Sequence, residues 1–107
     1  MKQILMVILI LLSTQVFALT YPANSLTVDF TVSTRKGTAP LALNFISKLN
    51  NAVKWCRWDF GDGTTSKLCK PAHIYRKAGI YSVSLQAANT TGPVITIKRD
   101  YIQIINK

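Results

Sequence analysis

Glutamate is absent from this sequence, and its 107 residues include only four aspartates and one histidine. Active sites for acid–base, nucleophilic or metal-dependent chemistry are built mostly from carboxylates, histidine and cysteine. With so few of these residues, the sequence shows no Ser-His-Asp set, metal cluster or phosphate-binding loop. We therefore expect no cofactor, and an enzyme ranks last among the function classes considered below.

Long apolar runs are also lacking, except at the start of the chain. Lys2 precedes an apolar run at residues 4–12, and Val16-Phe17-Ala18 follows a short polar stretch. This pattern is typical of a signal peptide, and the run is shorter than the roughly 20 residues of a spanning helix. We predict a signal peptide at residues 1–18, no later transmembrane segment, and export to the periplasm, the cell surface or the medium. An uncleaved membrane anchor is the alternative.

Residues 19–107 are long enough for one small domain. A domain of this size buries only about 60–65% of its chain surface on folding, so a covalent link adds useful stability. Cys56 and Cys69 are the only cysteines in the sequence. An even number of cysteines in an exported protein favours a disulfide over two free thiols.

The charge of the chain is strongly unbalanced. Thirteen lysines and arginines give a net charge of +9. Such a surface favours acidic partners, such as an anionic polysaccharide, lipid headgroups, nucleic acid or an acidic protein, without selecting among them. The basic residues are scattered, so a merely solvated basic surface is the alternative interpretation.

Strand-like alternation of apolar and polar residues is repeated along this domain, and no helical period occurs after residue 18. In each strand, one set of side chains would face the core. The predicted inward sets are Leu26, Val28, Phe30 and Val32; Leu41, Leu43 and Phe45; and Tyr81, Val83, Leu85 and Ala87. About seven short strands with turn residues between them indicate an all-β, immunoglobulin-like sandwich of two sheets.

The last apolar segment changes phase. Ile95 and Ile97 occupy odd positions, whereas Ile102 and Ile104 occupy even ones. A β-bulge near residues 98–100 would absorb this change.

Residues 55–69 predict a β-hairpin. Asp62-Gly63 is a preferred pair for a two-residue type I′ turn. That turn would place Cys56 directly opposite Cys69, at a separation that suits a cross-strand disulfide.

A three-residue loop at residues 61–63 is the alternative. It would pair Trp58 with Ser66 instead of Lys67, and it would move the two cysteines one residue out of step. We favour the two-residue turn, with a bulge as the fallback.

Several residues lie in the order and spacing of a PKD domain. They are Gly37-Thr38-Ala39-Pro40, Trp58 to Gly63, Pro71, His73, Tyr75, Gly79, Tyr81, Val83, Leu85 and Gly92. The sequence resembles this family over most of residues 26–105. The resemblance implies an extracytoplasmic immunoglobulin-like module for interaction or spacing, often beside enzymes that degrade polysaccharide or protein. It also implies structural roles for Trp58, Phe60, Gly61, Asp62, Gly63, His73, Tyr75, Gly79 and Tyr81.

Asp59 and Asp62 are the only carboxylates that lie close together in the sequence. Alternation directs Asp59 to the outer face of its strand, and Asp62 can accept hydrogen bonds from turn amides. A weak calcium site at these two residues is the alternative. His73 resembles a core residue of the family that is hydrogen-bonded beneath the hairpin.

The outer face of the same strand is the candidate binding face. If the odd-numbered Trp55 and Arg57 point outward, they join basic and amide side chains of neighbouring strands in an amphipathic, aromatic platform. Its predicted members are Trp55, Arg57, Lys67, Lys70 and Gln86. Basic side chains that simply cover Trp55 are the alternative.

We expect a monomer that acts as a secreted, non-catalytic interaction module. Its expected partner is an extracytoplasmic protein or an anionic or neutral polysaccharide, with no specific nucleic acid. The alternative function is a structural subunit of a larger envelope or surface assembly, whose strand edges are available for pairing.

Overall fold

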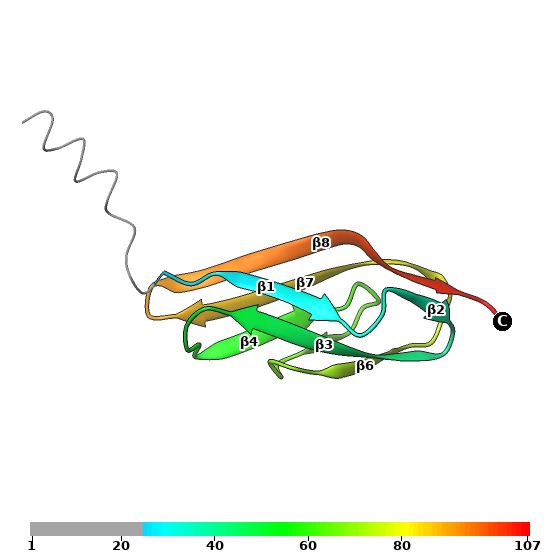
Figure 1. The fold of residues 1–107 in the computed structure, drawn as a ribbon, viewed down its shortest axis with the longest axis horizontal. Helices are drawn as coiled ribbons and strands as arrows, with labels where there is room; N and C mark the ends of the chain where they lie inside the picture. Colours follow the sequence, from blue (N-terminus) through cyan, green and yellow to red (C-terminus); the bar gives the residue numbers. More distant parts are fainter. Residues whose placement is uncertain (1–24) are drawn as a thin grey trace, which may run out of the picture.

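The computed structural model describes residues 25–107, which form eight strands and no helix. The strands are β1 (Val28–Val32), β2 (Lys36–Thr38), β3 (Leu41–Leu49), β4 (Trp55–Asp59), β5 (Thr65–Ser66), β6 (Ala72–Tyr75), β7 (Gly79–Asn89) and β8 (Gly92–Ile105). One sheet has the order β1-β3-β6 and the other the order β2-β8-β7-β4-β5. Figure 1 shows the two layers. The predicted two-sheet sandwich is confirmed, with one more strand than expected.

The predicted signal peptide and its cleavage position lie outside the described residues. Within residues 25–107, no helix has the length and apolar character that a membrane span requires.

Alternation along the strands correctly predicts the core. Every side chain of the three predicted inward sets is buried or partly buried. In β4, Cys56 and Trp58 are buried while Trp55, Arg57 and Asp59 are exposed. One strand therefore presents an apolar surface to the core and a different set of side chains to solvent.

Trp58 lies at the centre of the core and is completely buried. Its ring packs edge-on against Phe30, at 5.0 Å between ring centroids, and lies 5.3 Å from the ring of Phe45. The two phenylalanines come from the opposite sheet, so these contacts hold the sheets together. The indole Nε1 has no hydrogen-bond partner among the described residues.

The hairpin after β4 has the alternative register, so the predicted type I′ turn is wrong. Trp58 pairs with Ser66, and the amide of Phe60 donates to the carbonyl of Thr64 at 3.1 Å. Gly61 and Gly63 have φ angles of +82° and +88°. A type I′ turn would instead need positive φ at residue 62.

Gly61 also approaches the next strand closely. A Cβ atom built on it would lie 2.3 Å from the carbonyl oxygen of Ser82. Only glycine fits this position, so Gly61 permits the three-residue loop to lie against β7.

The predicted disulfide is present despite the different register. Cys56 and Cys69 are joined with their Cα atoms 5.3 Å apart. Strand β5 ends at Ser66, whose hydroxyl oxygen accepts a hydrogen bond from the amide of Leu68 at 3.2 Å. The chain thus leaves the ladder before Cys69, and this departure corrects the one-residue offset.

The predicted bulge in β8 is confirmed. The pairing of β7 with β8 shifts between Tyr81 and Val83, which pair with Ile102 and Lys98. Asp100 has a φ of 51°, and its amide donates to the hydroxyl of Ser82 at 3.0 Å. The bulge does not absorb a change of phase, however, because the two steps from Val83 to Tyr81 match four steps from Lys98 to Ile102. Even-numbered residues therefore face inward on both sides of the bulge: Ile102 is fully buried, whereas Ile95 and Ile97 are exposed, so the expected change of phase is wrong.

Candidate functional site

Two parts of the described structure hold the residues predicted from the sequence. The hairpin pocket lies beside the loop at residues 61–63, and the outer face is the exposed side of the five-stranded sheet around β4.

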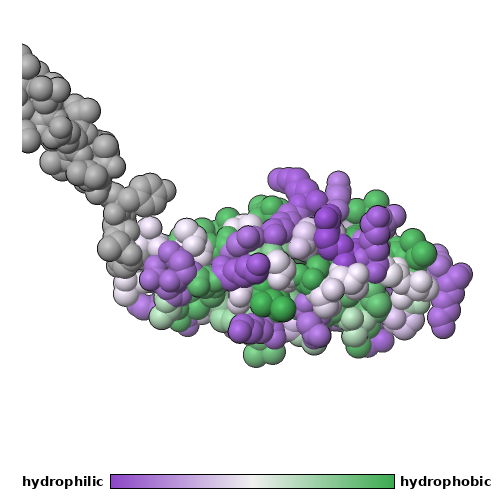
Figure 2. Space-filling model, in the orientation of Figure 1, coloured by the Kyte–Doolittle hydropathy of each residue, from purple (hydrophilic) through white to green (hydrophobic). Residues whose placement is uncertain are grey.

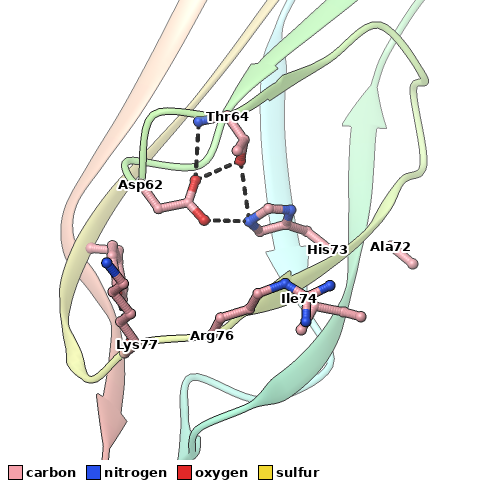
Figure 3. A pocket seen from close by; sticks show the side chains of 8 residues that line it. Asp62, Thr64, Ala72, His73, Ile74, Arg76 and Lys77 are labelled. Carbon is pink, nitrogen blue, oxygen red and sulfur yellow. Dashed lines mark hydrogen bonds and ion pairs between the residues drawn. The ribbon is translucent and has the colours of Figure 1, made fainter.

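Three polar side chains of the hairpin pocket hydrogen-bond one another (Figure 3). His73 Nε2 lies 2.7 Å from Asp62 Oδ2, and the Thr64 hydroxyl donates to Asp62 Oδ1 at 2.5 Å. His73 comes from β6, so these bonds fasten the hairpin loop of one sheet to a strand of the other. The ring of His73 also stacks on Phe60, with centroids 4.1 Å apart. His73 therefore lies beneath the hairpin, where the sequence predicts it.

The ionisation of Asp62 reflects these contacts. Partial burial works to raise the pKa of Asp62, but the hydrogen bonds from Thr64 and His73 outweigh it, and the pKa lies below its ordinary value. The neighbouring Tyr75 donates its hydroxyl to the carbonyl of Phe60 at 2.9 Å, and burial raises its pKa. The fold thus favours the carboxylate form of Asp62, which accepts hydrogen bonds, and the neutral hydroxyl of Tyr75, which donates one.

This arrangement differs from a nucleophilic site. The Thr64 hydroxyl lies 3.3 Å from His73 Nε2, the same nitrogen that contacts Asp62. In a catalytic triad the carboxylate and the nucleophile contact opposite nitrogens of the imidazole. The geometry of Thr64, His73 and Asp62 suits fastening of the loop.

The two loop carboxylates are already engaged. Asp59 Oδ1 accepts from the amide of Gly61 at 2.9 Å, and both oxygens of Asp62 accept hydrogen bonds. Residues 25–107 contain no group of three or more histidine, cysteine or acidic side chains placed to hold a metal ion. Calcium binding at Asp59 and Asp62 stays a prediction that a calcium titration tests.

The rest of the hairpin pocket is lined by basic and apolar side chains. Arg76 and Lys77 stand on the side away from the loop, and Ile74 forms an apolar wall that is 43% exposed. Tyr81 closes the floor and donates its hydroxyl to the carbonyl of Lys77 at 2.6 Å.

The outer face contains most of the predicted binding residues. Trp55 is 44% exposed, and Arg57 lies beside it on β4. Arg57 pairs with Gln86 of β7. Lys67 and Lys70 are exposed but lie in the segment between β5 and β6, outside the strand ladder.

Two residues of the outer face were missed in the sequence. Ile95 and Ile97 of β8 are 54% and 50% exposed. Ile95 pairs with Gln86 of β7, which pairs with Arg57 of β4. Residues paired across a sheet point to the same side, so Ile95, Gln86 and Arg57 form one row. They were missed because the sequence interpretation treats both isoleucine pairs of β8 as inward and assigns their different parity to the bulge, whereas even-numbered residues face inward throughout β8.

The surface mixes hydrophilic and apolar side chains. Figure 2 shows hydrophilic side chains spread over the visible side of the sandwich, separated by small apolar patches.

The sandwich with an engaged hairpin loop and an open sheet face belongs to the class of immunoglobulin-like binding or accessory modules. A family model for the PKD domain matches residues 22–104. The chain belongs to the PKD domain family.

Known proteins agree with this assignment. A microbial collagenase from Vibrio alginolyticus is 51% identical over 47 residues, which cover 44% of this chain and 6% of the collagenase. The PKD1 domain of Vibrio anguillarum Epp is 22% identical with a TM-score of 0.63, covering 77% of this chain and 98% of that domain. A structure of carbohydrate-binding modules of the β-sandwich superfamily is 20% identical with a TM-score of 0.69, covering 79% and 36%. The collagenase match thus spans one small part of a large enzyme.

Proposed function

We propose that this domain is an extracytoplasmic interaction module that binds a protein polymer through the outer face of its five-stranded sheet. One observation carries the proposal: Trp55, Ile95 and Ile97 are all about half exposed on the same side of one sheet. Large exposed apolar side chains that share one face of a sheet favour an interaction surface over isolated exposure.

The composition of the outer face favours a protein over a polysaccharide. Arg57 and Asp59 lie on this face in the rows of Ile95 and Ile97, and arginine and tryptophan are enriched at protein interfaces, whereas lysine is depleted. A sugar ring stacks on aromatic faces, and among the described residues Trp55 is the only exposed tryptophan. The matched relative is named for acting on collagen, a protein polymer, which supports the same choice.

A polysaccharide ligand is the second candidate. The similarity to the carbohydrate-binding modules concerns the fold, and Trp55 beside Arg57 would stack on a sugar ring and bind its acidic substituents. The disulfide between Cys56 and Cys69 supports an oxidising compartment outside the cytoplasm for either ligand.

Co-sedimentation with insoluble polymers tests the proposal. The domain is incubated with collagen fibres, chitin, cellulose and heparin resin, and the bound fraction is measured. We expect retention on collagen, and Trp55→Ala should weaken it by about tenfold or more because buried aromatic side chains dominate interface energies. Ile46→Ala is the matched control, since Ile46 is 45% exposed on the other sheet.

The outcomes separate the candidates. Retention on chitin or cellulose that is lost with Trp55→Ala supports the polysaccharide instead. Retention that disappears with added salt and is the same in Trp55→Ala would show a merely electrostatic attraction and contradict the use of the outer face.

A further inference from the structure

The edge of β8 offers a second interaction surface. β8 pairs with β7 over nearly its whole length, but on its other side only residues 103–105 pair, with β2. Within the described chain, no strand pairs with the earlier part of β8 along this side. In Figure 1 that part of β8 forms the border of the molecule.

The alternation of an antiparallel ladder identifies the free backbone groups. The β7–β8 hairpin closes with Asn89 opposite Gly92, a hydrogen-bonded pair, so Val94 and Thr96 also direct their backbone groups toward β7. The amides and carbonyls of Ile95 and Ile97 therefore point away from β7, to the free side.

The contacts with β2 support this assignment. The amide of Gln103 donates to Arg35 at 2.7 Å, and the carbonyl of Ile105 accepts from Ala39 at 2.8 Å. The backbone groups of Gln103 and Ile105 therefore point to the same edge of β8 as those of Ile95 and Ile97. The edge thus already accepts one strand farther along.

Two other edges of the sandwich, at β1 and β5, are protected. The carbonyls of Val28 and Phe30 in β1 accept hydrogen bonds from the side chains of Thr96 and Lys98, at 2.5 and 2.6 Å. The outermost strand at the far side of the large sheet, β5, has only two residues. Short edge strands and capping side chains are common protections against unwanted pairing.

The free part of β8 is short and has defined ends. Pro93, which has no amide proton, precedes it, and the bulge at residues 99–101 follows it. Between them, Ile95 and Ile97 present exposed apolar side chains on the outer face and unpaired backbone groups at the edge.

We propose that residues 95–99 of β8 accept an extended, acidic segment of a partner protein as an added strand. Main-chain hydrogen bonds would supply the pairing, and alternate apolar side chains of the segment would pack beside Ile95 and Ile97. Acidic residues are favoured because the chain carries a net charge of +9 and because Arg99, at the end of this stretch of β8, is exposed. A second copy of this basic chain is disfavoured for the same reason.

Amide hydrogen exchange, followed by NMR, tests the proposal. The probe is an acetylated and amidated peptide of alternating aspartate and valine, and the control peptide has lysine in place of aspartate. We expect the probe to slow exchange at Ile95 and Ile97 by about tenfold, while Val94 and Thr96, already paired with β7, change little. The control peptide should leave all four amides unchanged.

Two variants distinguish this edge from the outer face. Ile97→Pro removes an edge amide without removing a bond to β7, so the fold should persist and the protection by the probe should disappear. Ile97→Val keeps the amide and should keep the protection. Trp55→Ala tests the proposed function and should leave the effect of the probe unchanged, so the two proposals fail separately.

Several results would overturn the inference. They are unchanged exchange at Ile95 and Ile97 when the probe is in the millimolar range, equal effects of both peptides, and protection without peptide that grows with protein concentration. The last result would show a second copy as the occupant, and sedimentation equilibrium would reveal the dimer. The wild-type exchange measurement is decisive even if Ile97→Pro does not fold.

Discussion

The two faces of β4 carry one tryptophan each, and the surroundings of these residues differ completely. Trp58 is fully buried between the sheets, where the rings of Phe30 and Phe45 contact it. Trp55, three residues earlier, is 44% exposed on the outer face. Residue type alone therefore says little about role, whereas the position of a residue in the pleat separates a core tryptophan from a binding candidate.

The largest expected effect contrasts the two tryptophans directly. Trp58→Ala should lower the free energy of unfolding by about 3–5 kcal/mol, because it leaves a cavity between the sheets. Trp55→Ala should change it by less than about 0.5 kcal/mol. Urea denaturation followed by circular dichroism measures both, and similar losses for the two variants would contradict the assignment of the faces.

Trp58→Phe sharpens the same contrast if the alanine variant is too unstable to study. The indole Nε1 of Trp58 has no hydrogen-bond partner among the described residues. Phenylalanine removes this buried donor, so the loss should be clearly smaller than for alanine.

The next effect concerns the link between β4 and the segment after β5. Replacing Cys56 and Cys69 together by serine should lower the free energy of unfolding by about 3 kcal/mol, because the closed loop spans 13 residues. Chemical reduction of the wild type is the control and should cause a similar loss. A fully stable reduced protein would show that the disulfide contributes nothing to the fold.

The smallest effect depends on pH and tests the hairpin pocket. The lowered pKa of Asp62 means that the folded state favours the carboxylate, so its contribution is present above the unfolded pKa of about 3.9 and is lost as the pH falls through the lower folded pKa. Asp62→Asn should therefore cost about 1 kcal/mol at neutral pH and progressively less as the pH falls from neutral through the folded pKa.

Denaturation of both proteins across this pH range measures the difference. Asp59→Asn is the matched control, since Asp59 accepts only a local amide. A loss for Asp62→Asn that is independent of pH would show that charge has no part in fastening the loop.

The fold was largely predictable because strand alternation reports burial directly. Phe30, Leu43 and Leu85 each lie at the centre of an alternating segment, and each is buried. The short β2 was missed because Lys36, Gly37 and Thr38 have no apolar pattern, and their pairing with β8 depends on a contact that is distant in the sequence.

The turn and the outer face show why the remaining features were not predictable. Asp62-Gly63 favours a two-residue turn locally, but the loop has three residues and packs Gly61 against Ser82 of β7, a contact that is distant in the sequence. Similarly, Ile97 is exposed because even-numbered residues of β8 face inward on both sides of the bulge, and this facing is fixed by the pairing with β7 rather than by the apolar character of Ile97.

The parallel pairing of β2 with β8 has a mechanical consequence. β1 begins at one end of the sandwich and β8 ends at the other (Figure 1). Tension between the two ends therefore acts along the strands. The bonds from Gln103 to Arg35 and from Ala39 to Ile105 lie across this direction, so they share the load and must break together. The domain should therefore stretch little when its two ends are pulled apart.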